Sequence, residues 1–211
     1  MARDVTDVLE AVIDSGRVSL HAVLDPTYEE ITGPRIASLG RLFDVSRVPP
    51  AGFDPPKYST AYDALVDDEL MALYDRHLLA HPWLALVVGS DLNVYGPVHA
   101  RRFTADWTGD PAKDLLGNRV KRILADNPAL AKANRVGLGG RELPCRPLTR
   151  TELRMAGCDL AEPPGGDDRR LVQTYARDTG TILTVLSVPV YVHGERWGAA
   201  VIGWDPDAVA H

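Results

Sequence analysis

The stretch LVQTYARDTGTILTVLSVPVYVHGERWGAAVIGW, residues 171–204, decides the fold of this chain. It holds three apolar runs rich in β-branched and aromatic residues, at 171–177, 181–192 and 197–204. The polar segments DTG and HGER between them are typical of tight turns that join antiparallel strands. Pro189 in the middle run indicates a bulge or a position whose amide the ladder does not need. The pattern predicts three consecutive antiparallel strands.

Two further strands are predicted upstream. WLALVVG (83–89) is a compact apolar run, SDLN (90–93) supplies turn residues, and VYGPVH (94–99) resumes the run. Two apolar runs separated by turn residues are typical of a β-hairpin. Together with the C-terminal strands they predict an α+β fold with a five-stranded antiparallel sheet and flanking helices.

Helices are predicted before the first hairpin. Apolar residues recur at helical spacing from Val5, weaken at Ser15-Gly16 and break or kink at Pro26, and a second helical stretch runs to Ile31. This N-terminal extension suits either covering a sheet or pairing with another copy of itself. The stretch 33–57 is rich in Pro and Gly and is typical of connecting structure.

A helix is expected over residues 62–81, ended by Pro82. We therefore divide the chain into a helical lead-in and wrap, residues 1–58, and a main domain, residues 59–211, that fold together as one unit. Between the sheet halves, 127–170 reads mostly as loop, with a helical turn near its start and a short helical piece around 151–156.

A helix is also predicted over residues 111–126, with Asp110 as its N-cap and Pro111 at its first position. On a helical wheel Arg119 falls inside the apolar face, whereas Lys121 projects toward solvent. Burying a guanidinium without an anionic partner is costly. The partner is either an internal carboxylate, such as Asp63 or Asp178, or the anionic group of a ligand.

Composition excludes several classes of protein. The chain has 211 residues and a formal net charge of −6, so it offers no basic footprint for nucleic acid. No window approaches the ~20 apolar residues of a membrane span, and the N-terminus has no continuous apolar stretch of a signal peptide. Cys145 and Cys158 lack the spacing of a zinc site. A reduced, cytoplasmic protein is the simplest interpretation.

Motifs for catalysis are missing from the sequence. There is no GxSxG, HExxH, phosphate-binding loop or EF-hand pattern. We therefore expect a protein that is not an enzyme.

Four phrases of the sequence resemble a known family: PPKYSTAYDALVDDEL, DLNVYGPVHARRFTADWTGDPAKDLLGNRVKRI, LVQTYARDTG and LSVPVYVHGERWGAAVIGW. They are similar, in this order, to a Cache/PAS-like sensory domain of bacterial methyl-accepting chemotaxis proteins. The resemblance implies a signal-input domain with a PAS-type fold. Three features depart from it: the chain has no methyl-accepting coiled coil, it has His99-Ala100 where the family often has His-Asn, and residues 137–168 form an insertion that can reshape or cover the site.

Candidate binding residues follow from these motifs. His99 is either a satisfied structural histidine, a hydrogen-bonding partner of a ligand, or the axial ligand of a haem. Covalent haem of the c type is excluded because no CxxCH occurs. Arg122 flanks Arg119 and extends the polar patch. Aromatic residues of the motif-bearing phrases line a pocket or simply pack the core. The full set of candidate ligand-binding residues is Tyr58, Tyr95, His99, Trp107, Arg119, Arg122 and Tyr175.

Three functions fit the sequence. The first is a cytoplasmic, homodimeric signal-input domain that binds a small molecule with an anionic group between its sheet and helices. The second is a haem-binding sensor of the same fold, with His99 as axial ligand. The third is a ligand-free module for dimerisation or partner docking.

Overall fold

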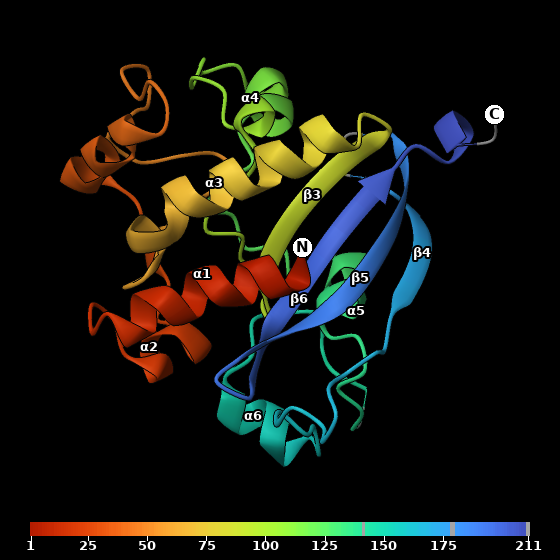
Figure 1. Cartoon of the computed structure of the whole chain (residues 1–211). Helices are drawn as coiled ribbons and strands as arrows, with labels where there is room; N and C mark the ends of the chain where they lie inside the picture. The colour runs from red at the N-terminus through yellow and green to blue at the C-terminus, as the bar shows by residue number, and fades with distance from the viewer. Residues whose placement is uncertain (141, 178–179, 210–211) are drawn as a thin grey trace.

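A four-stranded antiparallel sheet forms the centre of the molecule (Figure 1). The computed structural model describes residues 1–140, 142–177 and 180–209. The strands lie in the order β3-β6-β5-β4, so the first strand of the sheet along the chain pairs with the last. Their bounds, which confirm the predicted β-runs at 83–89 and 171–204, are β3 Leu84–Asp91, β4 Leu171–Ala176, β5 Ile182–Val192 and β6 Glu195–Trp204.

The β5–β6 hairpin forms where the sequence predicts it. His193 and Gly194 join the strands with φ values of 47° and 74°, the left-handed conformations of a two-residue hairpin turn. A register shift between Val190 and Tyr191, directly after Pro189, is the expected irregularity. On the other side of β6, a Cβ at Gly198 would lie 2.0 Å from the Ser90 carbonyl oxygen, so only glycine allows β3 and β6 to approach this closely.

The predicted fifth strand, residues 94–99, is wrong. This segment joins no sheet among the described residues and makes only an isolated bridge between Tyr95 and Ile123. The Asp91 carboxylate accepts the amides of Asn93 and Tyr95, and Val94 adopts a φ of 56°. These local bonds turn the chain away from β3 instead of returning it alongside as a ladder.

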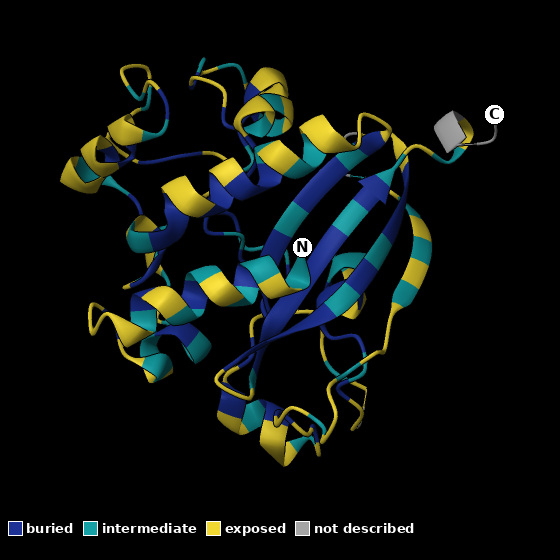
Figure 2. Ribbon diagram, viewed as in Figure 1, coloured by how far each residue is buried: buried dark blue, intermediate teal, exposed yellow. Residues whose placement is uncertain are grey.

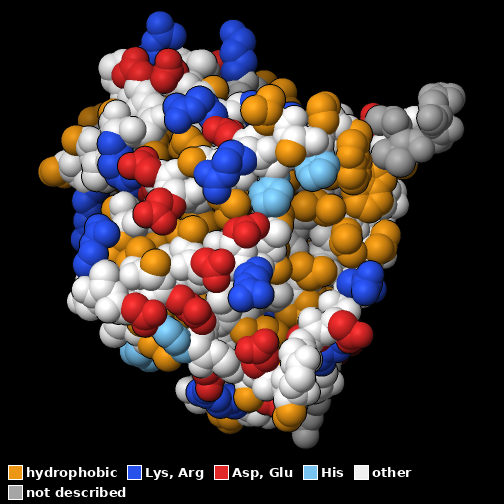
Figure 3. Space-filling model, viewed as in Figure 1, with side chains coloured by type: hydrophobic (Ala, Val, Ile, Leu, Met, Phe, Trp, Pro, Cys, Tyr) orange, Lys and Arg blue, Asp and Glu red, His pale blue; other side chains and the backbone are white. Residues whose placement is uncertain are grey.

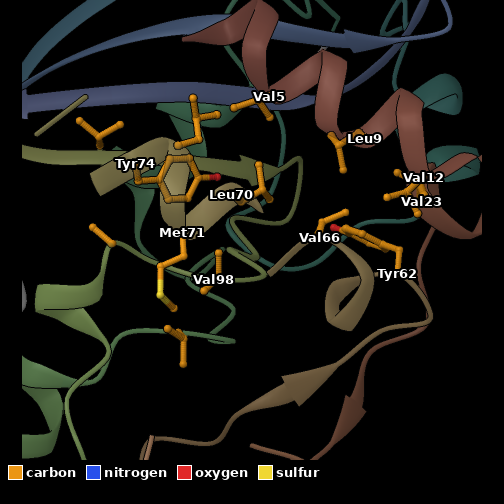
Figure 4. Close-up of a cluster of buried hydrophobic side chains, with 14 of the residues drawn as sticks. Val5, Leu9, Val12, Val23, Tyr62, Val66, Leu70, Met71, Tyr74 and Val98 are labelled. Carbon is orange, nitrogen blue, oxygen red and sulfur yellow. The ribbon is translucent and has the colours of Figure 1, made fainter. Parts of the chain in front are cut away.

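Two helices cover one face of the sheet, α1 (Ala2–Asp14) and α3 (Asp63–Ala80) (Figure 1). Their apolar stripes meet in the main core, which Figure 2 shows as the buried side of each helix and Figure 4 shows in detail. The lead-in helix therefore takes the first of its two predicted roles and covers a sheet. Residues of this core include Val5, Leu9, Val12, Val66, Leu70, Met71 and Tyr74.

The connection from α1 to α3 wraps the outside of the core. It contains α2 (Leu20–Leu24), the 3-10 helix η1 (Gly33–Arg41) and a two-stranded sheet of β1 (Glu29–Glu30) with β2 (Tyr58–Ser59). The predicted helical stretch up to Ile31 is wrong, because pairing with β2 makes residues 29 and 30 extended.

Lys57 connects the N-terminal segment, residues 1–58, to the main domain. Its ammonium group lies 5.6–5.8 Å from the ring centres of Phe43, Phe53 and Trp107 and donates to the carbonyls of Asn118 and Val120. Burial lowers the pKa of Lys57 well below its usual value, and the positive charges of neighbouring residues lower it further. The aromatic rings and carbonyl oxygens offset part of that cost.

The opposite face of the sheet carries α5 (Pro128–Asn134), which lies behind the strands in Figure 1. The predicted helix over 111–126 is only half right: α4 ends at Gly117 (Pro111–Gly117), and Asn118 caps it in an extended conformation. Beyond the cap the chain is irregular, and Lys121 has a φ of 58°. The helical wheel consequently misplaces Lys121, which is 1% exposed and binds Asp63 and Asp67 at 3.0 Å each.

Described residues of the stretch 137–168 form, together with Leu92, a second small core beside α6 (Arg150–Met155), which begins with the capping box of Thr149 and Glu152. Cys145 is exposed and Cys158 is buried, and both are free thiols. The buried residues of this second core are Leu92, Leu138, Leu148, Leu153, Cys158 and Leu160.

Apolar side chains also reach the surface. In Figure 3 they gather on the right of the view, over the part of the sheet that α1 and α3 leave uncovered. Val172 and Ile182 of the strands β4 and β5 are 58% and 52% exposed. Among the described residues, no helix is long and apolar enough to span a bilayer.

Candidate functional site

A cavity of about 70 Å³ lies between the sheet and α5. Strands β3, β4 and β6 form its floor, α5 forms its roof, and the segments around residues 94–99 and 119–124 close its sides. Four of the seven predicted binding residues line this cavity: His99, Arg119, Arg122 and Tyr175. Among the described residues of 137–168 none lines the cavity, whereas the sequence suggested that this insertion could cover the site.

One end of the cavity continues into a surface groove. Arg119, Arg122, Tyr175 and Arg177 line both the cavity and the groove. The groove is bordered by residues 126–128, of which Asp126 and Pro128 are exposed. Three guanidinium groups therefore surround the route from solvent into the cavity. We call this end the arginine mouth.

The irregular segment after α4 brings two of these arginines to the cavity. The Arg119 amide donates to the Phe103 carbonyl at 2.8 Å, and its Nη1 donates to the Leu115 carbonyl at 3.3 Å. Arg122, which is 8% exposed, returns to the cavity after the left-handed turn at Lys121. Arg119 therefore lines the cavity, although the helix on which its predicted position rested ends two residues earlier. That it meets an anionic group stays a prediction.

The third arginine, Arg177, is not among the binding residues predicted from the sequence. Arg177 follows β4 directly and lies two residues after Tyr175, so both side chains lie on the same face of the strand. Its guanidinium lies 5.9 Å from the Phe103 ring centre. The two-residue spacing in QTYAR was the signal that would have found it.

His99 is buried beside these charges and is neutral. It is 7% exposed, and its ring packs edge-on against Phe103 at 4.6 Å between centres. Burial lowers the pKa of His99 to about 3, and the guanidinium groups of Arg119, Arg177 and Arg102 contribute in the same direction. Desolvation and neighbouring cations both disfavour the charged imidazolium.

The hydrogen bonds of His99 decide which nitrogen carries its proton. The Ala100 amide donates to Nδ1 at 3.0 Å, so the neutral ring carries its hydrogen on Nε2. Within the described residues, Nε2 makes no hydrogen bond to the protein. His99 therefore offers a donor to whatever occupies the cavity.

The same geometry disfavours the predicted haem. Histidines that ligate metals through Nε2 keep their proton on Nδ1 and donate it to a carboxylate or carbonyl, whereas Nδ1 of His99 accepts a hydrogen bond. A cavity of about 70 Å³ also falls far short of a porphyrin. Among the described residues no group of three His, Cys, Asp or Glu side chains is placed to bind a metal ion.

The remaining three predicted binding residues do not line the cavity. The Tyr95 hydroxyl lies 2.7 Å from Asp63 Oδ2 and 3.0 Å from the Tyr58 carbonyl, within the main core. Tyr58 pairs with β1 in the small sheet, and Trp107 belongs to the rings around Lys57. For these residues core packing and strand pairing explain the aromatic side chains.

The internal carboxylates proposed for Arg119 have different positions. Asp63 Oδ2 binds Lys121 at 3.0 Å, lies 2.7 Å from the Tyr95 hydroxyl and accepts the Thr60 amide at 3.0 Å. Asp63 therefore serves the buried lysine instead. Asp178 lies outside the described residues.

No family model, curated protein or solved structure matches this chain. The resemblance to a Cache/PAS-like sensory domain accordingly stays a prediction.

Proposed function

We propose that this chain is a signal-input domain that binds a small anionic molecule in the cavity between the sheet and α5. The observation that carries the proposal is the neutral His99 ring, which lines the same cavity as the three arginines of the mouth and whose Nε2–H makes no hydrogen bond among the described residues. An anionic oxygen in the cavity supplies an acceptor for the His99 N–H, at a place where the positive charges of Arg119, Arg122 and Arg177 favour an anion.

The fold supports a role in signalling. The cavity lies on one face of the sheet, while α1 packs on the opposite face against β5 and β6. A ligand that tightens the cavity wall shifts strands on which the N-terminal helix rests. The homodimer and cytoplasmic location predicted from the sequence belong to the same proposal, as does the absence of enzymatic activity.

Thermal unfolding in the presence of small anions tests the proposal. Sodium acetate, butyrate, phosphate and citrate are compared with sodium chloride at equal ionic strength. At about 100 times its Kd, a ligand adds roughly 2.7 kcal/mol to the free energy of unfolding, which raises the Tm by about 5–10 °C for a chain of this size. We expect at least one of the four anions to do so.

Two variants tie the shift to this site. Arg119→Ala removes one guanidinium of the mouth, and His99→Phe keeps a flat ring but removes the N–H donor. Both are expected to abolish the shift. Arg101→Ala is the matched control, because that side chain is 78% exposed and lies outside the cavity. No shift with any anion, or a shift that survives both variants, contradicts the proposal. If no anion raises the Tm and light scattering shows that the chain is a dimer, the ligand-free docking module becomes the better explanation.

A further inference from the structure

The two ends of the cavity differ in chemistry. The arginine mouth is shared with the surface groove, whereas the inner end is not. The inner end is lined by apolar side chains from three elements and the turn after β3, and His99 lines the cavity but not the groove. The apolar lining residues are Leu86, Val88, Val94, Ala133 and Val201.

The polar residues of the inner end are already satisfied. Ser90 Oγ donates to Asn134 Oδ1 at 2.6 Å, and Asn134 Nδ2 donates to the Leu130 carbonyl at 3.1 Å. These bonds fix α5 to β3 and leave the amide and hydroxyl engaged within the wall. A second charged group of a ligand would meet Leu86, Val88 and Val201 there, and burying it would be costly.

Because one end of the cavity is cationic and the other is apolar, we infer that the ligand is a small amphipathic monocarboxylate. Such a ligand is an aliphatic or aromatic acid with one anionic head and an apolar tail. The inference rests on the proposed function and narrows it to one ligand class. The carboxylate lies in the arginine mouth with one oxygen accepting from His99 Nε2, and the tail occupies the inner end against β3 and β6. Dianions and phosphate satisfy the mouth but leave the apolar end unfilled.

Isothermal titration with a homologous series tests this assignment. The probes are sodium acetate, butyrate, hexanoate, benzoate and dodecanoate, with phosphate and citrate as head-group controls. Each CH₂ that enters the inner end is expected to tighten binding about fourfold, from the ~0.8 kcal/mol of a buried methylene. Affinity should rise from acetate to butyrate or hexanoate and fall for dodecanoate, whose chain exceeds a cavity of about 70 Å³.

A variant of the inner end separates tail from head. Ala133→Leu, on the buried side of α5, fills part of the inner end and is expected to remove the gain from acetate to hexanoate while acetate still binds. Ala129→Leu, on the same helix but outside the cavity wall, serves as the control and should leave the series unchanged. If Ala133→Leu fails to fold, Val201→Thr, which keeps the shape and adds a hydroxyl, is expected to weaken hexanoate but not acetate.

The outcomes distinguish this inference from the function on which it rests. Equal affinities along the series, or tight phosphate or citrate binding without binding of the monocarboxylates, overturns the ligand class and leaves an anion-binding domain. Absence of binding by every probe removes both.

Discussion

Replacing Lys121 with methionine is expected to lower the free energy of unfolding by about 3–5 kcal/mol. The Lys121 ammonium is 1% exposed and lies 3.0 Å from carboxylate oxygens of both Asp63 and Asp67, which are themselves buried. Methionine keeps most of the side-chain volume but leaves two carboxylates close together in the interior. Arg41 still pairs with Asp67, so one of the charges retains a partner.

Urea unfolding at several pH values measures this effect. Burial already raises the pKa of Asp67, against the opposing charges of Lys121 and Arg41. Without Lys121 the pKa of Asp67 rises further in the folded state, so the folded protein binds a proton more readily than the unfolded chain. The deficit of the variant should therefore shrink as the pH falls.

Lys113→Met is the matched control. That side chain is 72% exposed and lies 3.5 Å from Asp110, where the expected change is within ~0.5 kcal/mol. Equal unfolding free energies for the two lysine variants would show that the Lys121 pairs contribute nothing to stability.

The second large effect is expected for Arg196→Met, which should cost about 2–4 kcal/mol. Arg196 is 0% exposed and donates to the carbonyls of Gly198, Val136 and Asn134 at 2.6–3.1 Å. Asn134 is the last residue of α5 and Val136 follows that helix. Through these two carbonyls, one side chain of β6 holds α5, the roof of the cavity, to the sheet. Methionine fills the space but leaves three buried acceptors without a donor.

Amide hydrogen exchange shows which part of the structure loses stability in Arg196→Met. Amides of α5 should exchange faster in Arg196→Met, beyond what the global destabilisation explains, and anion binding should weaken with them. Arg154→Met is the control, since that guanidinium is 56% exposed and lies 3.5 Å from Glu195. Unchanged exchange in α5 despite a lower stability would contradict the role of Arg196 as its anchor.

The regular elements were predictable from sequence wherever the chain repeats one pattern. Strands β3 to β6, helix α3 and the short α6 all match predicted stretches to within two residues at each end, because alternation and helical spacing reflect burial directly. The failures lie where local hydrogen bonds override the pattern. The Asp91 carboxylate turns residues 93–95 away from the sheet, and Asn118 ends α4 before the apolar residues that seemed to continue it.

The candidate site was predictable in part for the same reason. Arg119, Arg122, His99 and Tyr175 come together because each belongs to a segment bordering the sheet face under α5. Lys121 was assigned to solvent because the helical wheel assumed a helix that does not exist there. Its partners Asp63 and Asp67 lie more than fifty residues away in α3, and no local pattern reports such a contact.

The most direct test of the central claim is a nuclear magnetic resonance titration of the His99 ring nitrogens in ¹⁵N-labelled protein, with His99→Gln used to assign the signals. We expect a neutral His99 ring with its proton on Nε2 from neutral pH down to about pH 4, because burial and the nearby arginines lower the pKa of His99 to about 3. We also expect that sodium butyrate shifts the Nε2–H resonance in the intact chain but not in Arg119→Ala. A ring that titrates near the ordinary histidine value, or an Nε2–H resonance that no anion moves, would contradict a cavity built to receive an anionic ligand.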